Sequence, residues 1–282
     1  MKRRNHLYGL FFISPWVMGF LAFVAYPLYR TIYFSFHTVR YSGELGYLYE
    51  LVGFENYKRI LTIEADFVLE LQNYIVKTLL YVPVIIALSI IIAILLNSKL
   101  KGTAFFRLIF FLPIIILNGE LMKNMRNYGG MDLEVGGIIS SIINRIVPES
   151  IIPLFIELFE MVSELLWYCG VPILIFLAAL QKIDKSLYEA AEIDGASFWN
   201  IFWKITLPII YPLISVVIVY VVVFLANFDA NPINNIIRTS RTDPSRREGY
   251  ASALSIIYAL AQTALIGILF FITRRREKGG IN

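Results

Sequence analysis

Glu189-Ala-Ala-Glu-Ile-Asp-Gly195 and, after a further nine residues, Ile205-Thr-Leu207-Pro208 form a polar connection between two long apolar stretches. Alanine and glutamate favour a helix, and Gly195 predicts a tight bend or a close approach between helices. Pro208 is placed for the first turn of the following helix, where a missing N–H costs little. We therefore expect a short helix-turn-helix that lies across the face of a membrane.

Composition places the chain among integral membrane proteins. Of 282 residues, 58% are hydrophobic and only 16% are charged, against about 25% charged in soluble domains. Cys169 is the only cysteine, so an intrachain disulfide is excluded, and two histidines argue against a His/Cys metal site. The sequence has no G-x-x-x-x-G-K-[ST] pattern and no hydrolase, metalloprotease or dinucleotide motif, so we expect no ATP site on this chain.

Apolar stretches long enough to cross a bilayer as helices recur along the chain. They predict an all-α membrane protein that forms a single transmembrane domain over residues 1–282. The third stretch carries Arg107 and Glu120 near its ends, where both side chains can snorkel to the interfaces. The expected spans are residues 7–29, 78–98, 103–122, 160–180, 205–228 and 249–273.

Basic residues predict the orientation of these six spans. One side of the membrane carries both termini and the segment around Glu189, and its basic residues are about twice as dense as those of the other side. The denser side is Lys2, Arg3, Arg4, Lys99, Lys101, Arg107, Lys182, Lys185, Lys204, Arg274, Arg275, Arg276 and Lys278. We expect this side, with both termini, to face the cytoplasm.

The complete pattern Glu-Ala-Ala, three residues, Gly, nine residues, Ile, one residue, Leu-Pro resembles the EAA loop of the permease subunits of bacterial ABC importers. Further segments are similar to the carbohydrate, maltose-transporter-like branch of that family. They are Leu10 to Phe20 with Tyr26-Pro27, Val52 to Tyr57, Phe110 to Pro113, Phe176 to Gln181 with Ile183-Asp184, and Tyr250 to Ser255. Because they occur in order around a complete EAA loop, the resemblance covers the whole chain.

The resemblance implies a cytoplasmic coupling helix that docks on an ATPase subunit. Its residues would be Glu189, Ala190, Ala191, Gly195, Ile205, Leu207 and Pro208. It also implies a second permease chain of different sequence, two ATPase subunits, an extracytoplasmic solute-binding protein and surrounding lipid, with no role for nucleic acid. ATP and Mg would bind the partner ATPase, with no cofactor on this chain. Transport of an oligosaccharide or related sugar would proceed by ATP-driven alternating access in the bacterial cytoplasmic (inner) membrane.

Polar and aromatic residues in the later spans are candidates for the solute path, because aromatic faces contact sugars and amides or acids bind hydroxyls. They are Glu164, Trp167, Tyr168, Asn227, Asp229, Tyr258 and Gln262. Trp167 and Tyr168 can equally be interfacial aromatics. Glu157, Glu160 and Glu164 share one helical face, which predicts either acids in water above the bilayer or an acidic outer vestibule that suits neutral sugars or cations.

Three alternatives stay open at this point. The first is an importer of the same class for glycerol phosphate or a polyamine. The second is a stand-alone secondary transporter or channel, which predicts intramembrane ionisable residues; the central thirds of the first, second, fifth and sixth spans contain none. The third is a membrane-embedded enzyme, which the absence of a nucleophile–base or metal constellation disfavours.

Overall fold

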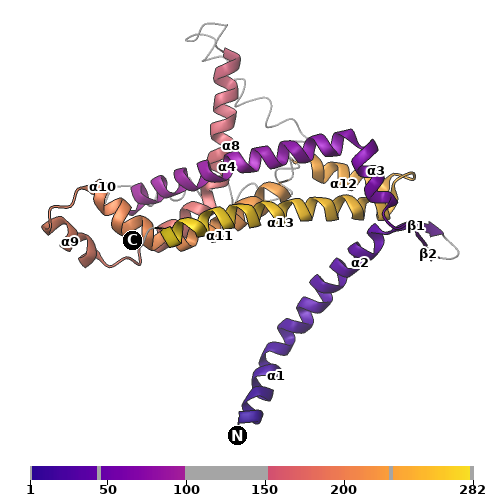
Figure 1. Cartoon of the computed structure of the whole chain (residues 1–282), viewed down its shortest axis with the longest axis horizontal. Helices are drawn as coiled ribbons and strands as arrows, with labels where there is room; N and C mark the ends of the chain where they lie inside the picture. The colour runs from indigo at the N-terminus through magenta and orange to yellow at the C-terminus, as the bar shows by residue number, and fades with distance from the viewer. Residues whose placement is uncertain (1, 43–45, 99–151, 229–230, 280–282) are drawn as a thin grey trace, which may run out of the picture. The chain divides into compact units, whose positions relative to one another are not determined.

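The computed structural model describes residues 2–42, 46–98, 152–228 and 231–279, and these ranges are predominantly helical (Figure 1). Two short strands, β1 and β2, pair antiparallel. The elements are α1 (Lys2–Phe20), η1 (Leu21–Ala25), α2 (Tyr26–Ser35), β1 (His37–Ser42), β2 (Gly46–Leu51), α3 (Glu55–Ile63), α4 (Ala65–Asn97), α8 (Ile152–Leu180), α9 (Lys185–Ile193), α10 (Phe198–Ile201), η2 (Phe202–Thr206), α11 (Leu207–Asn227), α12 (Pro232–Thr242) and α13 (Arg247–Gly279).

Four helices in the described ranges are long and apolar enough to cross a membrane. They are Phe11–Ser35, Ala65–Asn97, Phe198–Asn227 and Arg247–Arg274. The pair Leu165–Leu180 and Lys185–Ile193, bent by 69°, gives a fifth if it is counted as one span. The expected third span, residues 103–122, lies outside the described residues, and six spans remain a prediction.

Several helices begin well before the apolar stretches that predicted them. The second expected span starts at 78, but α4 starts at Ala65 and includes Asp66, Glu70 and Lys77. The fifth starts at 205, but helical backbone is continuous from Phe198. Hydropathy marks where a helix is apolar, whereas the backbone hydrogen bonds of a helix continue through polar residues until a cap or proline ends them. The starts at 78 and 205 stay predictions for where the apolar spans begin, and the helices themselves begin earlier.

Both π-helical turns, η1 and η2, come immediately before a proline of the next helix. Tyr26 N–H bonds to the carbonyl of Leu21, and Leu207 N–H bonds to that of Phe202, five residues back in each case. Pro27 and Pro208 follow, and a proline ring clashes with the carbonyl four residues before it. The wider π turn relieves that clash without breaking the helix. Pro208 thus lies in the first turn of α11, as predicted, but inside a longer helical rod.

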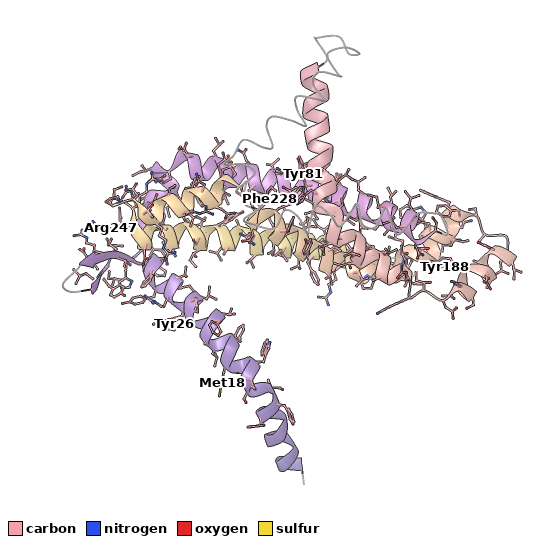
Figure 2. All side chains as sticks on the ribbon, turned by 180° about the vertical axis from the view of Figure 1, so that it is seen from behind. Met18, Tyr26, Tyr81, Tyr188, Phe228 and Arg247 are labelled. Atoms are coloured by element: carbon pink, nitrogen blue, oxygen red, sulfur yellow. The ribbon has the colours of Figure 1, made fainter. Side chains whose placement is uncertain are left out.

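The described chain forms two compact units, one made of residues 1–75 and 230–264 and the other of 76–229 and 265–282. In the first unit the β1–β2 hairpin follows α2 (Figure 1). The helical segment α1–η1 at the start of this unit is largely exposed. Phe11, Trp16 and Phe23 are 74%, 70% and 83% exposed, as expected for a surface that lipid or protein covers. Figure 2 labels Met18 and Tyr26 along this stretch.

An ion pair joins the beginning of α4 to the beginning of α13 in the first unit. Arg246 Nη2 lies 3.0 Å from Glu64 Oε1, and the Glu64 side chain is only 9% exposed. The guanidinium groups of Arg59 and Arg246 lie 5.3 and 6.0 Å from the centre of the Tyr250 ring. A Cβ at Gly249 would fall on the carbonyl oxygen of His37, so only glycine permits this approach. Arg247, labelled in Figure 2, begins α13 with φ of 64°.

The second unit is built on α11, which packs against α8. The buried residues of α11 recur every three or four positions, as in a helix with one face in a core. They are Ile210, Ile214, Val217, Ile218, Val221, Val222, Leu225 and Ala226. Cys169 on α8 is fully buried, and the Tyr211 hydroxyl donates to the carbonyl of Thr273 at 2.5 Å. This packing positions α8 and α11, the two helices that α9 and α10 connect.

Candidate functional site

Helix α9 contains the Glu-Ala-Ala sequence and begins at a side-chain cap. The Asp184 carboxylate accepts a hydrogen bond from the backbone N–H of Ser186 at 3.0 Å, which satisfies one of the free N–H groups at a helix start. This backbone bond, and then the Ser186 side chain, lower the pKa of Asp184 below its usual value. The cap is therefore formed at neutral pH. It fixes the point where the chain turns after α8.

Gly195 ends α9 in a Schellman motif. Ala196 N–H bonds to the carbonyl of Ala191, and Gly195 N–H bonds to that of Glu192, the two bonds that define this cap. Gly195 has φ of +76°, a left-handed conformation that favours glycine. Apart from its two neighbours, no described residue has an atom within 4 Å of a Cβ built there. Of the two roles predicted from sequence, the structure shows the bend and, within the described chain, no close approach.

A second short helix, α10, follows the glycine and is capped by Ser197, whose Oγ accepts from Asn200 N–H at 3.3 Å. Large apolar side chains on α9 and α10 are exposed: Ile193 by 86%, Phe198 by 69% and Trp199 by 65%. Figure 1 shows α9 and α10 as two short helices between α8 and α11. The predicted helix-turn-helix is therefore present, and it carries an exposed apolar surface of the kind that contacts another protein.

The two halves of the Glu189–Pro208 pattern are connected through one pair of hydroxyls. Tyr188, labelled in Figure 2, precedes the Glu-Ala-Ala sequence, and its Oη lies 3.3 Å from Oγ1 of Thr206. Thr206 lies between Ile205 and Leu207 of the second half. Sequence reasoning missed this pair because neither residue is a fixed position of the pattern.

Burial separates the predicted coupling residues into two groups. Glu189, Ala190, Gly195 and Pro208 are exposed, whereas Ala191, Ile205 and Leu207 are half-buried. On α9, Ala190 is therefore exposed like Glu189 and Glu192, and Ala191 is the less accessible of the two alanines. One surface of α9 is therefore exposed, and the other, which carries Tyr188, contacts Thr206 just before α11. The docking role of these seven residues stays a prediction.

Among the predicted solute-path residues, Tyr168 is packed inside an aromatic cluster of the second unit. It is 2% exposed, and its ring centre lies 5.8 and 5.6 Å from those of Phe224 and Phe228. Tyr81 lies 6.3 Å away; Figure 2 labels Tyr81 and Phe228. Trp167 is half-buried. Asn227 is exposed and donates to the carbonyl of Val223 of its own helix at 2.8 Å.

Tyr258 and Gln262 belong to α13 within the first unit, one helical turn apart. Tyr258 is 5% exposed; its hydroxyl accepts from Asn231 Nδ2 at 2.8 Å and its ring packs on Tyr74 at 5.1 Å. Asn231 also caps α12 through Ile233 N–H. The sequence Asn231-Pro232 carries that signal, an N-cap followed by proline, and the sequence analysis did not use it. Gln262 is half-buried.

The remaining candidates fall outside the described residues. Asp229 is one, and the side chains of Glu157, Glu160 and Glu164 are others, although their backbone belongs to α8. The predicted acidic vestibule therefore stays a prediction. Within the ranges that the structure does describe, no group of three His, Cys, Asp or Glu side chains could hold a metal ion.

A protein-family comparison identifies the family of this chain. The family model described as the binding-protein-dependent transport system inner membrane component matches residues 67–277. This range begins in α4, includes α9 and ends within α13. The chain belongs to this family. It is therefore a multi-pass inner membrane protein, and members of this family are components of binding-protein-dependent transport systems.

Relatives support the resemblance to the carbohydrate branch. The multiple sugar-binding transport system permease protein MsmF of Streptococcus mutans is 32% identical over 212 residues, 71% of this chain and 69% of that protein. The probable ABC transporter permease protein YesP of Bacillus subtilis is 32% identical over 200 residues, 69% of this chain. The chain spans 62% of the length of YesP.

A solved structure has the same fold. It is the crystal structure of a bacterial alginate ABC transporter in complex with an alginate pentasaccharide-bound periplasmic protein. The match has a TM-score of 0.70 at 20% identity and covers 98% of this chain and 96% of that one. At this identity the likeness concerns the fold alone.

Proposed function

We propose that this chain is a transmembrane permease subunit of a bacterial ABC importer that carries an oligosaccharide or related sugar. The observation that carries the proposal is the complete Glu189–Pro208 pattern, folded as two capped short helices between α8 and α11. The solute class is supported by relatives such as MsmF, whose name refers to multiple sugars. The alginate transporter with its pentasaccharide-bound partner agrees with an oligosaccharide.

The permease works as part of a complex. A second permease chain, most simply a different one, completes the solute path, two ATPase subunits bind ATP and Mg, and an extracytoplasmic binding protein delivers the solute. The chain crosses the membrane six times, with α9 and α10 in the cytoplasm. The exposed Ile193, Phe198 and Trp199 supply an apolar docking surface, and aromatic and apolar side chains dominate the energetic centres of protein interfaces.

Transport proceeds by alternating access. ATP binding closes the ATPase dimer, and the docked α9 helices of the two permeases move together. Because α9 is capped at Asp184 and at Gly195, it moves as a rigid body and opens the path outward. The chain itself forms no covalent intermediate with the solute.

The test is uptake by the whole complex in proteoliposomes, made with the ATPase, second permease and binding protein encoded beside this chain. A panel of labelled solutes includes neutral oligosaccharides, a uronate oligosaccharide, glycerol phosphate and a polyamine. We expect ATP-dependent uptake of an oligosaccharide, lost when the catalytic glutamate of the ATPase is changed to glutamine. Uptake that persists without the ATPase would indicate a secondary transporter. Uptake confined to glycerol phosphate or polyamine would refute the solute class.

A further inference from the structure

Helix α9 rests on the remainder of its unit through one face. Of its 9 residues, Tyr188 and Ala191 are half-buried and the others are exposed. Positions three apart lie on the same side of a helix, so these two define the inner face of α9. Tyr188 is the member that can form a directed bond, and its Oη lies 3.3 Å from Oγ1 of Thr206.

Thr206 lies at an irregular turn of the continuous helix Phe198–Asn227. It is the last residue of η2, the π turn in which Leu207 N–H reaches back to Phe202. Pro208, the next residue but one, has no backbone N–H and therefore cannot donate a hydrogen bond to the preceding turn. A π turn has a wider, less favourable geometry than an α turn and often marks a functional position. Thr206 itself is buried, at 6% exposure, so it cannot touch a docked partner.

We propose that Tyr188 and Thr206 form the positioning pair through which a displacement of α9 reaches α11. The inference rests on the proposed function. When the docked ATPase moves α9, the hydrogen bond pulls on the last residue of the π turn, and α11 responds as a unit from Leu207 onward. Neither residue contacts solute. Their bond keeps the direction of α9 fixed relative to α11.

The experiment removes each hydroxyl without changing the shape of the side chain. Tyr188→Phe and Thr206→Val are built into the whole complex, and uptake per ATP hydrolysed is measured. A single neutral hydrogen bond predicts a loss of about twofold to tenfold in this ratio. ATPase copurification should be unchanged. Thr206→Ser keeps the hydroxyl and should keep the ratio.

A matched control exists in the same unit. Tyr211 on α11 donates its hydroxyl to the carbonyl of Thr273 at 2.5 Å, so Tyr211→Phe removes a comparable bond that does not involve α9. It should leave the ratio near that of the native complex. The double variant Tyr188→Phe/Thr206→Val should be no worse than the more impaired single variant, because both remove the same bond.

Three results would overturn the inference while the native complex still transports. The single variants could keep the native ratio, they could lose the ATPase during purification, or their losses could multiply in the double variant. Failure of the native complex to show ATP-dependent uptake would instead refute the proposed function. The two ideas therefore fail separately.

Discussion

Replacement of Gly195 distinguishes a backbone requirement from a steric one at the end of α9. The structure gives Gly195 φ of +76° and open space where a Cβ would lie. An L-residue in this conformation costs about 1–2 kcal/mol, and asparagine pays less than other residues. For Gly195→Ala we therefore expect the equilibrium constant for forming the capped loop to fall by about fivefold to thirtyfold. Gly195→Asn should lose much less, although its side chain is larger.

The assay is the amount of ATPase that copurifies with the permease and the rate of ATP-dependent uptake, with membrane insertion measured beside them. The expected order of activity is Gly, Asn, Ala and then Val, because a β-branched residue is least tolerant of positive φ. If the glycine is needed so that a partner can approach, side-chain size sets the order and Asn falls below Ala. That order, or native activity for Gly195→Val, would refute the backbone argument.

Three further predictions concern the fold and its orientation. Arg246→Met removes the cation that pairs with the buried Glu64 carboxylate and should cost about 3 kcal/mol, the low end for a broken buried pair because the Arg246 side chain is 31% exposed. The melting temperature of the complex should fall by roughly 6–12 °C. Adding Glu64→Leu should recover part of this loss, and additive losses would contradict the pairing. Gly249→Ala forces a Cβ onto the carbonyl of His37 and should lower the melting temperature. The control Gly267→Ala places a Cβ in open space and should be neutral or stabilising. Equal effects of the two changes would argue against the close approach at Gly249. A C-terminal reporter should be active only as a cytoplasmic fusion, and an extracytoplasmic C-terminus would reverse the orientation of α9.

Sequence reasoning located α9 and the bend after it because their signals are local. Glu189-Ala-Ala191 favours a helix, and Gly195 favours a tight bend; each depends on residues a few positions apart. Helix starts were less predictable. The beginning of α4 at Ala65 is polar, so hydropathy does not mark it, and its position depends on packing within the first unit, where Glu64 meets Arg246.

The solute-path candidates show a second limit. Tyr168 and Tyr258 have the composition of sugar-binding residues, but the structure packs Tyr168 against Phe224 and Phe228 and bonds Tyr258 to Asn231. Whether an aromatic side chain lies in a core or on a path depends on residues distant in sequence. A list of suitable residue types does not contain that information.

The sequence by itself determined the membrane class, the family and the presence of a short helix-turn-helix between two apolar helices. These follow from composition, from fixed spacing and from short-range conformational preference. Only the tertiary structure decided that Gly195 serves the backbone of a Schellman motif in open space. It also decided that Tyr188 meets Thr206. The physical reason is that this bond joins positions 18 residues apart, whose meeting depends on how the intervening turn, α10 and η2 are folded.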